Sequence, residues 1–137
     1  MADKTISALT AVTSLDGTEP LPLVQGGTTK KATVSQVLTG QLVTESGTTR
    51  TLAATDNGKI ILCTSGSAVT ITCPTGLADG FNCTVIQMGA GKVTLAAGAS
   101  ATLVSYSSLF STMGQYAVIS AIQTGSDNFV AAGNLGV

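Results

Sequence analysis

The sequence predicts an all-β protein, with an extended N-terminal arm followed by a small antiparallel β-sandwich of jelly-roll-like type. From Arg50 onward, short apolar runs are separated by Gly, Asn, Asp and Ser clusters at a spacing of roughly ten residues, which is typical of sandwiches and barrels. Hydrophobic residues make up 44% of the chain but aromatic residues only 4%, so small and β-branched side chains fill the core. We therefore expect an arm over residues 1–45 and a sandwich over residues 46–137.

The arm has too few apolar residues, too widely interrupted, to close a core of its own. Between Ile6 and Leu15 an apolar residue recurs at every third position. This spacing fits either a short helix or an irregular segment, because the intervening Thr and Ser residues weaken helix propensity. The arm is therefore expected to gain its structure against another surface.

The second half of the arm carries a hairpin signal. Pro20 and Pro22 favour an extended backbone, and the Gly26-Gly27 pair that follows is a strong turn signal. The return strand is expected over Lys30–Val34. A short helix capped by Ser35 should follow it, and then a polar linker over residues 41–49.

The sandwich is expected to contain eight short strands. Within them apolar and polar residues alternate, as in Val69, Ile71 and Cys73 against Thr70 and Thr72, so that one face of each strand is buried. The expected strands are Arg50–Ala54, Lys59–Thr64, Ala68–Cys73, Phe81–Met88, Lys92–Ala96, Ala101–Ser105, Tyr116–Gln123 and Asn128–Ala132.

Charge and hydropathy exclude several classes of partner. Only 9% of residues are charged and the net charge is −1, which argues against nucleic acid, because phosphate binding needs a dense basic surface. No run of about 18 apolar residues is present, so no membrane helix is expected. The first residues, MADKTIS, lack the apolar core of a signal peptide, so we expect synthesis in the cytoplasm and reduced cysteines.

Two motifs that resemble ligand sites are better explained by structure. Cys63, Cys73 and Cys83 are ten residues apart, but the chain has no histidine and too few ligands for a structural zinc site, so we expect one buried thiol per strand and no metal. The run from Gly89 to Lys92 resembles a phosphate loop, but Ile86 stands where that loop needs its first glycine. We expect a turn between two strands there.

Catalysis has little support in the sequence. Four of the acidic residues, Asp16, Asp56, Asp79 and Asp127, adjoin Gly or Asn in expected turns, and no histidine is available as a general base. The chain is therefore expected to be neither an enzyme nor a cofactor-binding protein. A depolymerase would need a carboxylate pair in a groove, which the dispersed acids do not indicate.

Three aromatic residues, Tyr106, Phe110 and Tyr116, lie in or next to the loop from Ser105 to Gly114. They fit two interpretations. In the first they cover the open end of the sandwich, and in the second they form an outer contact with a saccharide or a neighbouring subunit.

The arm resembles a segment found in virion structural proteins of tailed bacteriophages. The resemblance rests on Thr18-Glu19 followed by the run Leu23-Val24-Gln25-Gly26-Gly27-Thr28-Thr29-Lys30-Lys31. That family includes head fibres, capsid decoration proteins and the N-terminal parts of tail fibres, in which the segment is an anchor. The remainder, including GFNCTVIQMGAGKVT, is similar to a small β domain that follows such anchors, where this run closes a hairpin.

The resemblance implies a capsid decoration protein of cement or head-fibre type: a homotrimer, made in the host cytoplasm, that binds the major capsid protein on the virion surface. The alternative is a tail fibre adaptor or a small receptor-binding tail component, which would contact host glycan through Tyr106–Tyr116. The chain ends at Val137 without a long shaft, which favours the head. The residues expected to anchor it to the capsid are Ile6, Leu9, Leu21, Leu23 and Val24, with Lys30 and Lys31 facing an acidic surface.

Overall fold

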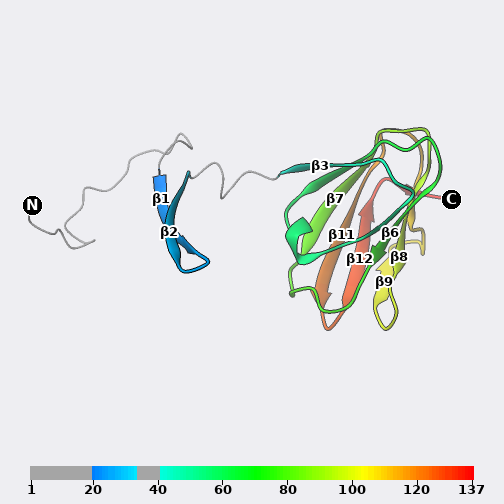
Figure 1. Cartoon of the computed structure of the whole chain (residues 1–137). Coiled ribbons are helices and arrows are strands. Elements are labelled where there is room, and N and C mark those ends of the chain that lie inside the picture. Colours follow the sequence, from blue (N-terminus) through cyan, green and yellow to red (C-terminus); the bar gives the residue numbers. More distant parts are fainter. Residues whose placement is uncertain (1–19, 34–40) are drawn as a thin grey trace, which may run out of the picture. The chain divides into compact units, whose positions relative to one another are not determined.

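The computed structural model describes residues 20–33 and 41–137 (Figure 1). The chain divides into two units, residues 1–39 and residues 40–137. Regular structure in the described residues consists of strands and a single turn of 3-10 helix, η2 (Ala54–Asp56). The expectation of an all-β protein is confirmed.

The described part of the first unit is a hairpin of β1 (Pro20–Gln25) and β2 (Thr28–Thr33), paired antiparallel. At its turn Gly26 and Gly27 have φ values of 59° and 75°, a left-handed conformation that favours glycine at both central positions of a two-residue loop. The predicted hairpin is confirmed. Val34 and the short helix expected at Ser35 lie outside the described residues.

The second unit, called the β domain below, contains two sheets (Figure 1). Both sheets contribute side chains to one hydrophobic core, so they pack face to face. The six-stranded sheet has the order β3 (Leu42–Glu45), β5 (Ile60–Cys63), β7 (Asn82–Gln87), β11 (Val118–Gly125), β12 (Asn128–Gly133) and β9 (Thr102–Ser105). The five-stranded sheet has the order β13 (Leu135–Gly136), β10 (Ser111–Thr112), β8 (Val93–Ala97), β6 (Val69–Cys73) and β4 (Thr49–Thr51).

The first six strands of the β domain form three stacked coils of a short β-solenoid. The chain passes from one sheet to the other in each coil, β3 to β4, β5 to β6 and β7 to β8. Successive coils pair in parallel within both sheets. Strands β10, β11, β12 and β13 then add antiparallel pairs, and β9 joins β12 in parallel.

The predicted antiparallel, jelly-roll-like arrangement is therefore wrong in its pairing, because the sheets are mixed. Alternation and turn residues are the same for a hairpin and for a coil corner. The choice between them depends on contacts between strands far apart in the sequence, which local patterns do not report.

The stacked coils explain the glycine run that resembles a phosphate loop. The amide of Gly89 donates to the carbonyl of Cys63 and that of Gly91 to the carbonyl of Ser65, so one coil corner rests directly on the next. A Cβ atom at Gly91 would lie 1.9 Å from the carbonyl oxygen of Ser67, closer than any side chain can approach. The run joins β7 to β8 in different sheets, so the hairpin expected from the resemblance is not formed.

All eight predicted strands are present, with ends shifted by a few residues. The prediction missed β3, β10 and β13. Residues 41–49, expected to be a linker, contain β3 and begin β4. The division between the two units accordingly falls after Thr39, whereas the expected boundary followed residue 45.

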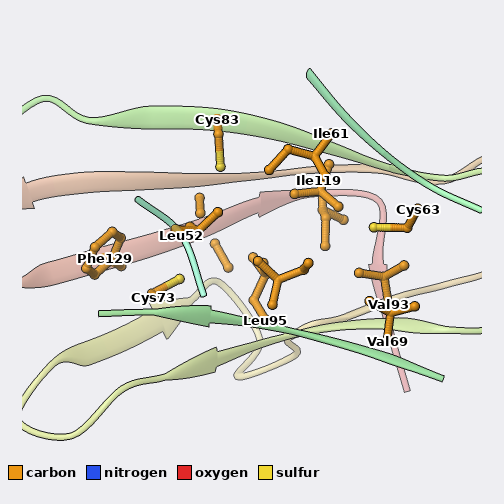
Figure 2. Close-up of a cluster of buried hydrophobic side chains, with 14 of the residues drawn as sticks. Leu52, Ile61, Cys63, Val69, Cys73, Cys83, Val93, Leu95, Ile119 and Phe129 are labelled. Carbon is orange, nitrogen blue, oxygen red and sulfur yellow. The ribbon is translucent and has the colours of Figure 1, made fainter. Parts of the chain in front are cut away.

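The core lies between the two sheets, and side chains from both point toward one another (Figure 2). Cys63, Cys73 and Cys83 are buried in this core, on β5, β6 and β7, which confirms the predicted burial of one thiol per strand. The predicted inward faces are also confirmed. The buried cluster is Leu52, Ile61, Cys63, Val69, Ile71, Cys73, Phe81, Cys83, Val85, Val93, Leu95, Ile119, Ala121, Phe129 and Ala131.

Candidate functional site

The described residues contain no group of three or more His, Cys, Asp or Glu side chains placed to hold a metal ion. Burial raises the pKa of Cys63 and Cys73 to about 11 and that of Cys83 to about 12, so all three thiols are neutral near pH 7 and unsuited to act as nucleophiles. No helix among the described residues has the length and apolar character needed to cross a membrane.

Within residues 20–33 and 41–137, the most concentrated set of charges is an ion cluster in the first coil. Arg50, the only arginine of the sequence, lies on β4 between two carboxylates. Its Nη2 is 2.7 Å from Oδ1 of Asp56 and its Nη1 is 3.0 Å from Oε2 of Glu45. The amide of Ala53 donates to Oδ2 of Asp56 at 3.0 Å, so the buried Asp56 carboxylate has a partner for each oxygen.

Hydrogen bonds favour the charged forms of Glu45 and Arg50. The amide of Gly47 donates to Glu45, and this bond, together with the one from Arg50, lowers the pKa of the Glu45 carboxyl. Burial opposes the charge of Arg50, but its hydrogen bonds to Asp56 and Glu45 outweigh that effect and raise its pKa. The cluster ties together β3, β4 and η2, and we assign it a structural role.

This cluster was not predicted from the sequence, because Asp56 was assigned to a turn and Glu45 to the linker over residues 41–49. The available signal was a single arginine with an acid five residues before it and another six residues after it.

The cluster also lies at the edges of both sheets. β3 and β4 are the edge strands of their sheets, and charges pointing inward on an edge strand oppose pairing with the edge of another sheet.

The predicted anchoring residues that the structure describes all lie on the hairpin: Leu21, Leu23, Val24, Lys30 and Lys31. Leu21 is 37% exposed, and Lys31 is also exposed. In the register Leu23 lies opposite Lys30, and Val24 opposite Thr29. None of the hairpin side chains that the structure describes is buried. Ile6 and Leu9 lie outside the described residues.

The three aromatic residues of the predicted outer contact have different environments. Phe110 is half-buried and packs against the core, so it covers the interior of the domain. Tyr106 is fully exposed and Tyr116 is 67% exposed. The structure therefore divides this set, leaving the two tyrosines available at the surface.

Tyr116 occupies a conformation that glycine normally adopts. It lies in a turn in which the amide of Ala117 donates to the carbonyl of Gly114 at 3.1 Å, and its φ is 68°. A left-handed backbone costs an L-residue roughly 1–2 kcal/mol. The turn is fixed from outside by the amide of Tyr116, which donates to the carbonyl of Gln87 at 2.7 Å. A bulky exposed side chain on strained backbone is a candidate contact residue.

Tyr106 borders a cavity of about 310 Å³ at the end of β9. Val130, Ala132 and Leu135 form apolar walls, and Ser107 contributes a hydroxyl group. No charged side chain lines the cavity. This favours an uncharged, largely apolar occupant over a saccharide, which would need several hydrogen-bonding side chains.

Comparison with known proteins adds no assignment: no family model matches the chain, and no curated protein sequence matches it.

Proposed function

We propose that the chain is a bacteriophage capsid decoration protein that binds the assembled shell as a homotrimer and stabilises it by binding, without catalysis or a cofactor. The observation that carries the proposal is the hairpin of β1 and β2. None of the hairpin side chains that the structure describes is buried. A two-stranded hairpin by itself is at best marginally stable in water. The lack of burial among its described side chains therefore suits this one to bind a partner. The resemblance of the same segment to phage anchors supports the major capsid protein as that partner.

The proposed mechanism is mass action. A protein that binds the closed shell and not its separated subunits raises the free energy of opening by RT ln(1 + [L]/Kd) at each site. The hairpin would supply apolar contacts through Leu21, while Lys31 faces acidic groups on the shell. The β domain, which has its own core, would stay on the outer surface of the virion after synthesis in the host cytoplasm.

The test is binding to purified shells, measured by co-sedimentation. We expect removal of residues 1–40 to abolish binding while circular dichroism shows that the β domain stays folded. We also expect the Lys30→Glu and Lys31→Glu double variant to bind at least tenfold more weakly. Lys59→Glu, a charge reversal in the β domain, is the control and should bind normally. Undiminished binding after removal of residues 1–40 would refute the arm hypothesis.

The second candidate is a tail component, either a fibre adaptor or a small receptor-binding module. The observation in its favour is the fully exposed side chain of Tyr106. Reconstruction of the intact particle distinguishes head from tail. Binding on a glycan array that disappears in Tyr106→Ala would favour the receptor-binding alternative over decoration of the head.

A further inference from the structure

The two sheets of the β domain present very different outer faces. On β4, β6, β8 and β10 the outward positions are almost all hydroxyl residues: Thr49, Thr51, Thr70, Thr72, Thr94, Ala96 and Ser111. The pairing places Thr49, Thr70, Thr94 and Ser111 in one row across the sheet. Such a polar outer face is expected of a sheet that meets water on one side.

The outer face of the six-stranded sheet, called the aliphatic face below, is different. Nine of its outward side chains are aliphatic, the rest are Thr, Ser or Asn, and none is charged. The aliphatic members are Leu42, Ile60, Leu62, Ile86, Val104, Val118, Ile122, Val130 and Ala132. The others are Thr44, Asn82, Thr84, Thr102, Ser120, Thr124 and Asn128.

Aliphatic side chains on neighbouring strands of this face adjoin one another. The register joins Ile122 to Val130 and Val130 to Val104, so three aliphatic side chains lie side by side on β11, β12 and β9. Leu42 is 65% exposed, Val104 50% and Ile122 37%. A strand with apolar residues on both sides is typical of a sheet that is covered on both faces.

We propose that a second copy of this chain covers the aliphatic face, so that this surface is where protomers of the assembly meet. Interfaces with separate, exchanging partners are enriched in Trp, Tyr and Arg anchors. The outward strand positions of the aliphatic face carry none of these, and Tyr106 only borders it, at the cavity lined by Val130 and Ala132. Obligate interfaces between subunits resemble a protein core cut in half. The Ile, Leu, Val and Ala of the aliphatic face match the residues of this chain's own core in type and size.

Charge and size fit the same occupant. An uncharged aliphatic surface is complementary to itself, because no pair of like charges is brought together when two copies meet. Six strands at about 4.8 Å spacing, each about 15–20 Å long, give roughly 500 Å² per copy. Two such faces bury about 1,000 Å² in total, the lower bound for a specific interface. The inference specifies the surface on which copies meet and depends on the proposed function only for the number of copies; in a homotrimer the three aliphatic faces would converge on the three-fold axis, each in contact with both neighbours.

The first test uses matched lysine variants of the full chain, with mass measured by sedimentation. Ile122 lies at the centre of the aliphatic face, and because it is partly exposed in the single chain, a lysine there can reach water without unfolding the domain. We expect Ile122→Lys to weaken self-association at least tenfold. Thr70→Lys, on β6 at the outer face of the five-stranded sheet, should leave self-association unchanged. Equal self-association of the two variants would overturn the proposal.

The second test keeps the proposal falsifiable if a lysine variant fails to fold. The native cysteines are at most 1% exposed, so a maleimide reagent should label only a cysteine introduced at the surface. We expect Ile122→Cys to react at least tenfold more slowly than Thr70→Cys and to lose this protection on dilution. Equal rates would show an open face. Protection that persists at a concentration where sedimentation gives the mass of a single copy would show that residues of the same chain cover it, and either result overturns the assignment to a second copy.

The outcome is separable from the proposed function. If the native chain self-associates but does not bind shells, capsid decoration is refuted and this interface is not. If the Ile122→Lys variant self-associates as fully as the native chain and still binds shells, the interface is refuted and capsid decoration is not.

Discussion

Substitution of Asp56 by alanine tests whether the ion cluster holds the first coil together. The Asp56 side chain is 2% exposed and accepts two hydrogen bonds, from Arg50 and from the amide of Ala53. Its loss leaves Arg50 with only Glu45, in a site where 22% of the arginine side chain is exposed. Removing one partner of a buried ion pair costs about 3–5 kcal/mol, and partial exposure places this case near 3 kcal/mol.

The expected effect on thermal stability is large. For a domain of about 100 residues, 1 kcal/mol corresponds to roughly 4–8 °C in Tm, so Asp56→Ala should lower the midpoint by about 12–24 °C in calorimetry. Asp56→Asn should cost less, because its side-chain oxygen can still accept from Ala53.

Glu45→Gln is the control for this prediction. It removes a charge from the more exposed partner and keeps a hydrogen-bond acceptor for Arg50, so it should cost about 1 kcal/mol or less. Equal losses for Asp56→Ala and Glu45→Gln, both below 1 kcal/mol, would refute the assignment of Asp56 as the buried anchor of the cluster.

Three further predictions concern the β domain. Gly91→Ala should destabilise it by several kcal/mol in denaturant unfolding, because the added Cβ would collide with the backbone of Ser67. Tyr116→Gly should have a higher Tm than Tyr116→Ala, because only glycine adopts a φ of 68° without strain. Equal Tm values would contradict the presence of backbone strain at this position. Stability should fall as pH rises from about 9 toward 11–12, because the thiols of the unfolded chain ionise first while those of Cys63, Cys73 and Cys83 stay protonated in the fold. A flat profile over that range in urea titrations at stepped pH would contradict the burial of these thiols.

The local structure of this chain could be predicted well from sequence because its signals are local. Alternation over Val69–Cys73 and the paired glycines at Gly26 and Gly27 depend only on neighbouring residues. Both were confirmed. Short strands made mainly of polar residues, such as β10, have no such signal and were missed.

The path of the chain between the sheets could not be predicted in the same way. The run from Gly89 to Lys92 reads equally well as a hairpin turn and as a coil corner, and only the contact of Gly91 with Ser65 and Ser67 decides between them. The ion cluster was missed for a related reason, because Glu45 and Asp56 meet Arg50 only once β3, β4 and η2 are in place.

The aliphatic face was visible in the sequence only in part. Strand runs such as Ile60-Ile61-Leu62 are apolar on both sides, which indicates burial on both faces. The strand order is needed to show that Ile60 and Leu62 share one outer face with Ile122 and Val104, while the hydroxyl residues collect on the other sheet.

The native mass of the full chain in solution tests most directly the claim that other copies of the chain cover its aliphatic face. Sedimentation equilibrium over a range of concentrations should give a multiple of 13.6 kDa, with three copies expected. A mass of 13.6 kDa at every concentration up to the solubility limit would contradict the account.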